Sequence, residues 1–380
     1  MSEPSPTATA PGADATTREI RQQPELWREV IHDGASWQPQ ATAFLAPLLD
    51  ASESRIVLTG AGTSAFVGDI LAPALTRALG RRVDAVPTTD IVSNPRGVFA
   101  EDVPTVLVSF ARSGDSPESV AATQLADRHL RSVRHVVITC SDEGRLYRER
   151  VDADDSLVLL MPPRANDEGF AMTSSFTSMV LAGWLALTGQ VLDDIAVDKL
   201  VAAGSHAVDD GFRTATELAA RGYDRVIYLG SGTLTGLAHE SALKLLELTA
   251  GRTVTYFDSA LGFRHGPKAV LDDRTLAVVY LSNDPYTRLY DEDIAAELGQ
   301  AMGPDHVLVI GTGERVVGRR GLVGGLEDVD DVLLTLPFVV YAQTVGLQFS
   351  LAVGATPDNP FPGGLVNRVV QGVTIHPESS

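Results

Sequence analysis

Three ionisable residues are spaced so that a helix would bring them to one face. Glu240, Lys244 and Glu247 stand at positions i, i+4 and i+7, and residues at this spacing lie on the same side of an α-helix. A solvated stripe of ion pairs, worth roughly a few tenths of a kcal/mol per pair, would need the same spacing. Against that alternative, Lys244 is one of only three lysines in 380 residues. The pattern therefore favours a site for proton transfer.

A histidine in a restricted loop is the second acid–base candidate. His265 lies within Gly262-Phe-Arg264-His265-Gly266-Pro267-Lys268, where the Gly-Pro pair limits the backbone. A single histidine more often has a structural role. However, imidazole titrates near neutral pH, which suits general acid–base catalysis beside a helix that carries carboxylates. We keep His265 as a candidate on that ground.

Two hydroxyl-rich turns could bind a phosphate group. Gly60-Ala-Gly62-Thr63-Ser64 and Arg112-Ser113-Gly114-Asp115-Ser116-Pro117 each follow an apolar run and open a helical stretch. Glycines let backbone N–H groups approach an anion, and the helix adds its positive end. The first turn also fits the dinucleotide motif G-x-G-x-x-A, with Asp84 about 20 residues further on, but its hydroxyls suit a terminal phosphate better. Either turn alone could be a helix cap, whereas the pair predicts a cup for one sugar phosphate. The candidate residues are Gly62, Thr63, Ser64, Arg112, Ser113 and Ser116.

A third hydroxyl cluster leaves two interpretations open. Thr173-Ser174-Ser175 follows the polar loop Asn166-Asp-Glu168-Gly169 and starts another helical stretch. Thr173 and Ser174 could close the phosphate cup, or they could simply cap their own helix.

Composition excludes several classes of protein. The net charge is −19 and no Lys/Arg-rich run occurs, which argues against a general nucleic-acid binder. Cys140, the single cysteine, ends an apolar run, so neither a disulfide framework nor a multi-cysteine metal site is expected. No uninterrupted apolar stretch approaches the ~18–20 residues of a membrane span, and the first 17 residues lack the basic start of a signal peptide. We expect a cytoplasmic protein.

The elements that must position these residues occur twice. Arg55–Thr63 and Arg225–Thr233 share an apolar β-branched run followed by Gly-x-Gly-Thr, at an offset of 170 residues, and helical stretches follow at Ser64–Ala78 and Leu234–Ala250. Strands that alternate with helices are typical of parallel sheets. We predict two tandem, doubly wound α/β domains related by duplication. Three later strand-like runs correspond at separations of 170 to 175 residues: Thr105–Ser109 with Thr275–Val279, His135–Thr139 with His306–Ile310, and Ser156–Leu160 with Asp331–Thr335.

Accessory segments complete the predicted organisation. Arg18–Leu49 and Ala196–Arg221 are expected to be helical, with Trp27 and Trp37 packing rather than binding, and a Pro/Gly-rich tail that covers the active site is expected after the second domain. The predicted parts are a disordered tail (1–17), an N-terminal helical segment (18–50), two domains (51–200 and 201–355) and a C-terminal tail (356–380).

These motifs resemble the sugar isomerase (SIS) domain family, in the order and spacing of the isomerase half of glucosamine-6-phosphate synthase. The resemblance extends from about Pro24 to the end of the chain. Three further segments resemble the AgaS proteins of amino-sugar catabolism: Asn166–Ser175, Thr356–Pro360 and Asn367–His376. The resemblance implies two tandem SIS domains and a galactosamine-6-phosphate deaminase/isomerase, an activity also described as tagatose-6-phosphate ketose/aldose isomerase.

The resemblance also implies roles for particular residues. Glu247 would move a proton between C2 and C1 of the sugar, Lys244 would hold its hydroxyl end, and His265, donated by a neighbouring subunit, would open the ring. A homodimer or tetramer would follow. The lysine that forms a Schiff base in the synthase is replaced here, at the aligned positions, by Val370 and Gln371. The synthase's glutaminase domain has no counterpart in the sequence, which favours release of ammonia over its capture.

Four functions remain open from the sequence. The leading one is a deaminase/isomerase that converts D-galactosamine 6-phosphate to D-tagatose 6-phosphate and ammonia without a metal or redox cofactor. The alternatives are an aldose/ketose isomerase without deamination, a glucosamine-6-phosphate deaminase, and a sugar-phosphate sensing module. The last is disfavoured, because the first 50 residues are too short and too neutral for a DNA-binding segment, and a sensor has no use for Glu247 and His265.

Overall fold

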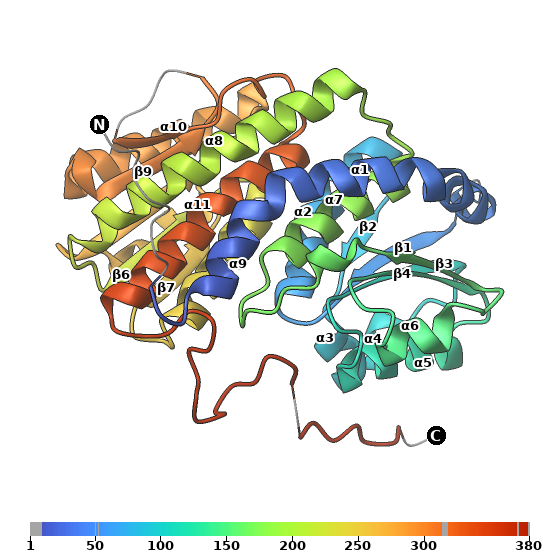
Figure 1. Cartoon of the computed structure of the whole chain (residues 1–380). Helices are drawn as coiled ribbons and strands as arrows, with labels where there is room; N and C mark the ends of the chain where they lie inside the picture. The colour runs from blue at the N-terminus through green and yellow to red at the C-terminus, as the bar shows by residue number, and fades with distance from the viewer. Residues whose placement is uncertain (1–9, 50, 52, 314–317, 371, 379–380) are drawn as a thin grey trace, which may run out of the picture.

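The computed structural model describes residues 10–378, except residues 50, 52, 314–317 and 371. It contains two five-stranded parallel sheets with the same topology (Figure 1). The first sheet has the order β2-β1-β3-β4-β5 and the second has the order β7-β6-β8-β9-β10. The tandem doubly wound architecture and the duplication predicted from the sequence are confirmed. The strands are β1 (Arg55–Thr59), β2 (Val83–Ala85), β3 (Thr105–Ala111), β4 (Val133–Thr139), β5 (Ser156–Leu160), β6 (Arg225–Leu229), β7 (Val254–Asp258), β8 (Thr275–Tyr280), β9 (Val307–Gly311) and β10 (Arg319–Leu322).

A shared layer of helices lies between the two sheets. One hydrophobic core runs from the inner face of the first sheet through these helices to the inner face of the second. Smaller cores cover the outer faces, beneath α3 and α5 on the first sheet and beneath α10 on the second. The shared-layer helices are α1 (Asp14–Leu49), α2 (Thr63–Leu79), α7 (Ser174–Thr188), α8 (Asp194–Ala219), α9 (Thr233–Leu248) and α11 (Asp331–Ala352). The remaining helices are α3 (Thr88–Ser93), α4 (Pro95–Val98), α5 (Pro117–His129), α6 (Arg145–Arg150) and α10 (Pro285–Met302).

One predicted strand is wrong. The run Asp331–Thr335, expected to match β5, is the first part of α11, and the true counterpart of β5 is β10. Asp330 caps α11 by accepting a hydrogen bond from the N–H of Val332 at 3.1 Å. The helix is apolar on every side, so its sequence lacks the helical periodicity that separates a buried helix from a buried strand.

Helix α11 is also the one described helix that is long and apolar enough to cross a membrane. However, 94% of its apolar window is buried inside the protein. It contacts α8 and α9 in the shared layer, so its composition reflects a place in the core.

The N-terminal helix begins earlier than predicted. Residues 14–17 were expected in a disordered tail, but α1 starts at Asp14, while residues 1–9 lie outside the described part. Asp358 of the C-terminal segment explains the difference, because its carboxylate accepts hydrogen bonds from the N–H groups of Ala15 and Thr16 at 3.1 and 2.8 Å. The predicted division at residues 200 and 201 falls inside the continuous helix α8.

We predict that Gly204→Ala destabilises the fold by about 1–3 kcal/mol, because overpacking outweighs the better helix propensity of alanine. A Cβ at Gly204 of α8 would lie 2.2 Å from Cζ3 of Trp27, which is fully buried on α1. Urea unfolding measures the change. The control is Gly324→Ala, where a Cβ has nothing within 4 Å. Equal stability of the two variants would contradict this packing.

Candidate active site

Four predicted phosphate-binding residues line one cavity. Ser64 comes from the start of α2, whereas Arg112, Ser113 and Ser116 come from the turn between β3 and α5. We call this cavity the first cup. Ser119, which the sequence analysis did not select, also lines it. Gly62 and Thr63 are not among its lining residues, although they shape the turn. The other lining residues are Ala61, Phe110, Ala111, Gly114, Met172, Arg368, Val369 and Val370.

The backbone of the first turn requires glycine. A Cβ at Gly60 would lie 2.5 Å from the backbone of Ser64, and Gly62 has a φ of 56° in the left-handed region. Among the described residues, the hydroxyl of Ser64 has only the sulfur of Met172 as a hydrogen-bond partner, at 4.0 Å. Its hydrogen-bonding capacity is therefore largely unused by the protein.

The second turn is partly a helix cap, as one alternative had it. Ser116 accepts a hydrogen bond from the N–H of Ser119 at 3.4 Å, and Pro117 occupies the first turn of α5. Ser116 also donates to Glu118 at 2.9 Å. Ser116 therefore both caps α5 and lines the first cup.

Arg112 supplies a buried cation at the cup. Its side chain donates to the carbonyls of Arg368 at 2.8 Å and Phe170 at 3.4 Å. Burial and the charge of Arg368 lower its pKa, but a guanidinium stays charged at physiological pH. Its position therefore ties the C-terminal segment to the cup.

The helix face predicted from spacing is formed by α9. Lys244 Nζ lies 2.6 Å from Glu247 Oε2 and 3.6 Å from Glu240 Oε1. The side chains of Glu240 and Lys244 are 0% and 1% exposed, but that of Glu247 is 24% exposed. Glu247 is therefore the member of this group that a ligand can reach.

Electrostatic effects connect this helix with the first cup. Burial disfavours the charge of Lys244, but Glu240 and Glu247 outweigh it and raise the pKa of Lys244, while Arg112 acts in the opposite direction. The pKa of Glu240 is raised to about 8, because burial and Glu247 outweigh the influence of Lys244 and the Thr63 hydroxyl. Among the described residues, neither oxygen of Glu240 has a hydrogen-bond partner of normal geometry. Glu240 is a buried acid that the sequence analysis named without giving it a role.

His265 does not line the cup of its own chain. It is exposed after the short helix Gly262–Arg264, and Gly266 follows with a φ of 120°. The cations on either side are fixed, because Arg264 Nε lies 2.8 Å from Glu297 and Lys268 also pairs with that carboxylate. The loop is held to α10 while the imidazole projects outward.

Thr173 and Ser174 do not line the first cup, and Thr173, at the N-cap position of α7, makes no side-chain capping hydrogen bond, so neither alternative is supported. Both are fully buried. The Thr173 hydroxyl donates to Asp167 at 3.0 Å, and the Ser174 hydroxyl donates to the carbonyl of Glu19 at 2.8 Å. Their expected part in phosphate binding is not supported by this placement, because their hydroxyls are already occupied.

Two buried carboxylates that the sequence analysis missed hold this region. Asp167 accepts five hydrogen bonds from residues 173–175. Glu19 of α1 accepts hydrogen bonds from the N–H groups of Glu168 at 2.6 Å and Gly169 at 3.2 Å. The polar loop at residues 166–169 could have indicated this region, but Glu19, which binds the loop, lies about 150 residues earlier in the sequence.

The C-terminal segment crosses from the second half to the first (Figure 1). It is anchored by Asp358 at the start of α1 and by Glu378, which lies 2.9 Å from Arg96 and 2.7 Å from His129. Between these anchors, Arg368 to Val370 line the first cup. Gln371, the other position aligned with the synthase lysine, lies outside the described residues.

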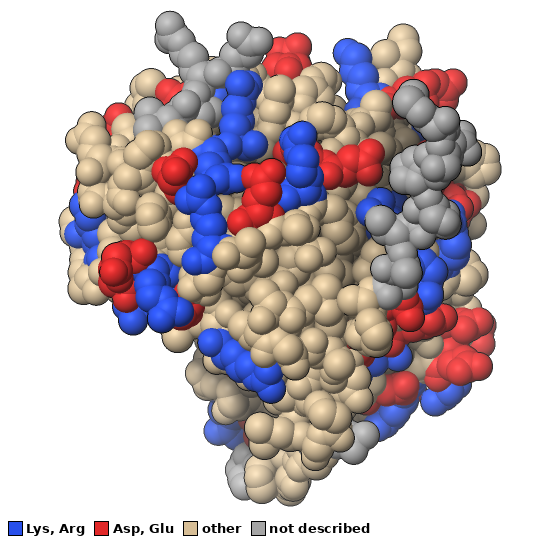
Figure 2. Space-filling model, turned by 60° about the vertical axis from the view of Figure 1, so that its left-hand side comes forward, with Lys and Arg blue, Asp and Glu red and all other residues tan. Residues whose placement is uncertain are grey.

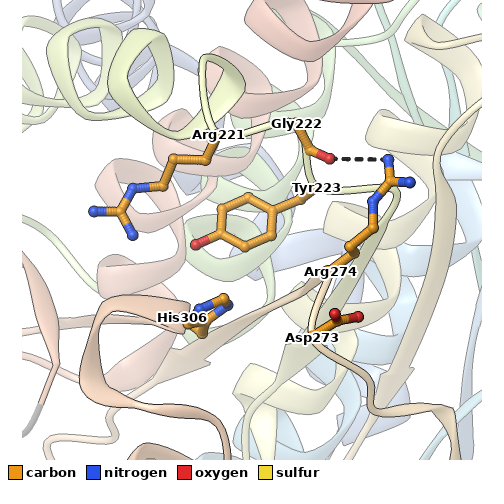
Figure 3. Close-up of a pocket in the computed structure, with 6 residues that line it drawn as sticks. All are labelled: Arg221, Gly222, Tyr223, Asp273, Arg274 and His306. Atoms are coloured by element: carbon orange, nitrogen blue, oxygen red, sulfur yellow. Dashed lines mark hydrogen bonds between the residues drawn. The ribbon is translucent and has the colours of Figure 1, made fainter.

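Other polar clusters fit a ligand less well. A hollow where the strands of the second sheet begin is lined by Arg221, Tyr223 and Arg274 (Figure 3). Both arginines already pair with carboxylates, Arg221 with Asp305 and Arg274 with Asp224.

The ligand atoms of Asp127, His135 and Asp155 lie within 4.8 Å of one another. Arg150 occupies this group by pairing with both aspartates, so we assign no metal to it. Cys140 is buried, which raises the pKa of its thiol and fits the structural role expected for it.

On the face shown in Figure 2, basic and acidic residues lie close to one another in its upper part, and a broad area carries neither.

Comparisons with known proteins give a consistent result. The SIS domain model matches residues 50–189. An AgaS protein of Streptomyces coelicolor is 56% identical over 98% of both chains. The D-galactosamine-6-phosphate deaminase AgaS of Escherichia coli is 44% identical over 98% of both chains. Among solved structures, a tagatose-6-phosphate ketose/aldose isomerase from Escherichia coli superimposes with a TM-score of 0.90 at 39% identity, covering 98% of this chain and 99% of that one.

Glu19→Gln is predicted to change how stability depends on pH. Burial and Asp167 raise the pKa of Glu19 from 4.5 to about 7, so between these values the folded chain keeps a proton that the unfolded chain releases. This contribution is complete below about pH 4.5 and is lost as pH rises to about 7, at a cost on the order of 1–3 kcal/mol. Glutamine keeps the acceptor and removes the titration. Urea unfolding from pH 4.5 to 7.5 measures the difference from wild type.

The control for this test is Glu25→Gln, which removes an exposed carboxylate from the same helix. It should follow the wild-type curve. Parallel curves for wild type and Glu19→Gln would show that Glu19 does not titrate in this window.

Proposed function

Because this chain belongs to the AgaS family of SIS-domain proteins, we propose that it is a D-galactosamine-6-phosphate deaminase/isomerase. The single observation that supports this best is the 44% identity to the Escherichia coli deaminase over 98% of both chains. The product would be D-tagatose 6-phosphate, and ammonium would be released. The reaction would need no metal or redox cofactor, since the carbonyl of the opened sugar itself acidifies the C2 proton.

The first cup would bind the phosphate group. Hydroxyls of Ser64, Ser113 and Ser116 line it, the N-terminus of α2 adjoins it, and Arg112 adds one buried positive charge. Local donors of this kind suit a chain whose net charge of −19 gives no long-range attraction to an anion.

Glu247 would carry the proton from C2 to C1. Its partial exposure and the hydrogen bond from Lys244 at 2.6 Å support this role, because a fixed donor orients the carboxylate. The sequence resemblance gives Lys244 the hydroxyl end of the sugar, but its burial favours orientation of Glu247 over contact with substrate. Proton transfer from C2 to C1 leaves an imine at C2, and water then converts this imine to the ketose and ammonium.

The absence of a cup lysine supports hydrolysis by water. Val370 lines the cup where the synthase family has a lysine, and none of the residues that line the cup is a lysine. No lining residue could therefore form a covalent imine with the sugar, and the imine of the substrate itself remains accessible to water.

His265 would open the sugar ring of a neighbouring subunit. The exposed loop that carries it adjoins Val254, Tyr256 and Leu261, whose side chains are also exposed. Exposed apolar side chains beside an edge strand favour contact with another chain. We therefore propose a homodimer, alone or paired into a tetramer. We also propose a cytoplasmic location.

A second candidate function has its own support. The Escherichia coli structure at 39% identity is described as a tagatose-6-phosphate ketose/aldose isomerase. Isomerisation without deamination would use the same cup and the same proton transfer, so only the fate of nitrogen separates the two functions.

Ammonium release should occur from galactosamine 6-phosphate without added cofactor. The purified protein is incubated in parallel with galactosamine 6-phosphate and glucosamine 6-phosphate, and both ammonium and ketose phosphate are measured. Release from the galacto sugar alone is the expected result. Release from the gluco sugar would keep the mechanism and change the substrate. Isomerisation of tagatose 6-phosphate without ammonium from either sugar would favour the second function.

Two inactive variants should restore activity when mixed. Glu247→Gln keeps the cup and should bind the substrate without turnover, and His265→Ala should lose ring opening. If His265 acts across an interface, a mixed dimer of the two has one site with neither defect. Co-refolding equal amounts should then return about a quarter of wild-type activity, since about half of the dimers are mixed and each has one intact site.

The control refolds each variant alone by the same procedure, and both should stay inactive. If the Glu247→Gln and His265→Ala mixture stays inactive while each variant still forms dimers, the histidine would have to act within its own chain.

A further inference from the structure

The chain builds the anion-facing turn of the first cup a second time. Gly62 has φ 56° and ψ −130°, and Gly232 has φ 57° and ψ −125°. A Cβ at Gly60 or Gly230 would lie 2.5 or 2.6 Å from the backbone of the second residue of the following helix. The turn after β6 therefore repeats the turn after β1 in its backbone angles and its close approach.

The second turn of the cup is repeated as well. Ser282-Asn283-Asp284 follows β8, the strand that corresponds to β3. Asp284 caps α10, and Pro285 occupies its first turn, as Ser116 and Pro117 do in α5. Two polar turns thus lie at the ends of neighbouring parallel strands in both halves. We call the copy formed by Ser231, Ser282 and Asn283 the second cup.

Carboxylates of the protein itself occupy the donors of the second cup. Asp291 of α10 accepts from the Ser231 hydroxyl at 2.5 Å and from the Ser282 N–H at 3.0 Å. Asp331 of α11 accepts from the Ser282 hydroxyl at 2.5 Å and from the Asn283 N–H at 2.8 Å. Four donors of these two turns are therefore each satisfied by a carboxylate oxygen.

These carboxylates are held there at an electrostatic cost. Asp291 is fully buried, and burial raises its pKa to about 6 in spite of the hydrogen bonds from Ser231 and Ser282. Burial likewise raises the pKa of Asp331. In the first cup Ser116 donates to Glu118, but among the described residues the Ser64 hydroxyl has only the Met172 sulfur, at 4.0 Å, as a partner.

The acid–base residues are distributed the opposite way between the two halves. At the offset of 170 residues, Glu240, Lys244 and Glu247 correspond to Ile70, Ala74 and Arg77 of α2. The first half thus has the first cup but no acid–base residues at these positions of α2, and the second half has those residues on α9, beside the occupied second cup.

We propose that Asp291 and Asp331 are internal ligands that close the second cup, so that each chain binds one sugar phosphate, in the first cup only. The inference takes from the proposed function that the first cup binds the phosphate ester. An external phosphate at the second cup would find its donors in use and would meet two carboxylates. One substrate per chain would then be presented to the single acid–base helix, α9.

The wild-type stoichiometry tests this proposal. An open-chain hexitol 6-phosphate has no carbonyl and cannot react, so its equilibrium binding to the full-length protein can be measured by calorimetry or dialysis. One equivalent per chain is expected, and Ser113→Ala with Ser116→Ala should abolish it. Two equivalents, or one that survives these changes, would overturn the proposal. No saturable binding to wild type would instead contradict the proposed function.

Opening the second cup gives a complementary test. The double variant Asp291→Ala and Asp331→Ala should bind a second equivalent of inorganic phosphate, and phosphate should raise its Tm more than that of wild type. The matched control is Asp284→Ala, which removes an exposed carboxylate from the start of α10 and should gain no site. A folded double variant that still binds one equivalent would overturn the role of the two carboxylates. If it folds only in phosphate, that rescue supports the proposal; if it does not fold at all, the wild-type stoichiometry decides.

Discussion

The site depends on one close crossing of two helices. A Cβ at Gly236 of α9 would lie 2.7 Å from the backbone nitrogen of Ile70 in α2, so only glycine lets the two helices approach this closely. Because α2 begins at the first cup and α9 carries Lys244 and Glu247, the crossing brings the phosphate site that we propose in one half close to the proton-transfer residues that we propose in the other. Glu240 lies one turn after Gly236, where the Thr63 hydroxyl influences its pKa. Neither half contains both groups of residues, and the crossing joins them.

Two buried cations interact near the proposed phosphate site. An acidic chain binds a phosphate through local donors, and Arg112 and Lys244 are both buried, with the charge of Arg112 acting to lower the pKa of Lys244. Each is held by hydrogen bonds, to carbonyls in one case and to Glu247 in the other. Their mutual repulsion is opposed by the carboxylates of Glu240 and Glu247. Removing one member would leave another buried charge without compensation, which is costly in a low-dielectric site.

Local patterns predicted the fold and part of the site, and long-range contacts account for the rest. The Gly-x-Gly-Thr turns and the β-branched runs before them depend on neighbouring residues, so their positions could be read from the sequence. The strand predicted at Asp331–Thr335 failed because α11 is apolar all round. Glu19 and Asp358 could not be found, because each acts on residues at least 140 positions away. Thr173 and Ser174 have the composition of a phosphate turn, but their donors are already used by Asp167 and Glu19.

The two halves must differ if the duplicated fold is to serve one reaction. Two identical halves would form two anion cups and two acid–base faces. A substrate bound in the second cup would then be out of reach of the residues that act on a substrate in the first cup. Asp291 and Asp331 fill one cup, whereas Ile70, Ala74 and Arg77 leave α2 without the residues for proton transfer. Arg77 even pairs with Asp330, the cap of α11, and so binds the first half to the second at the position where α9 carries Glu247. The duplicated positions thus stabilise the contact between the halves at Arg77 of α2 and carry the proposed acid–base residues on α9.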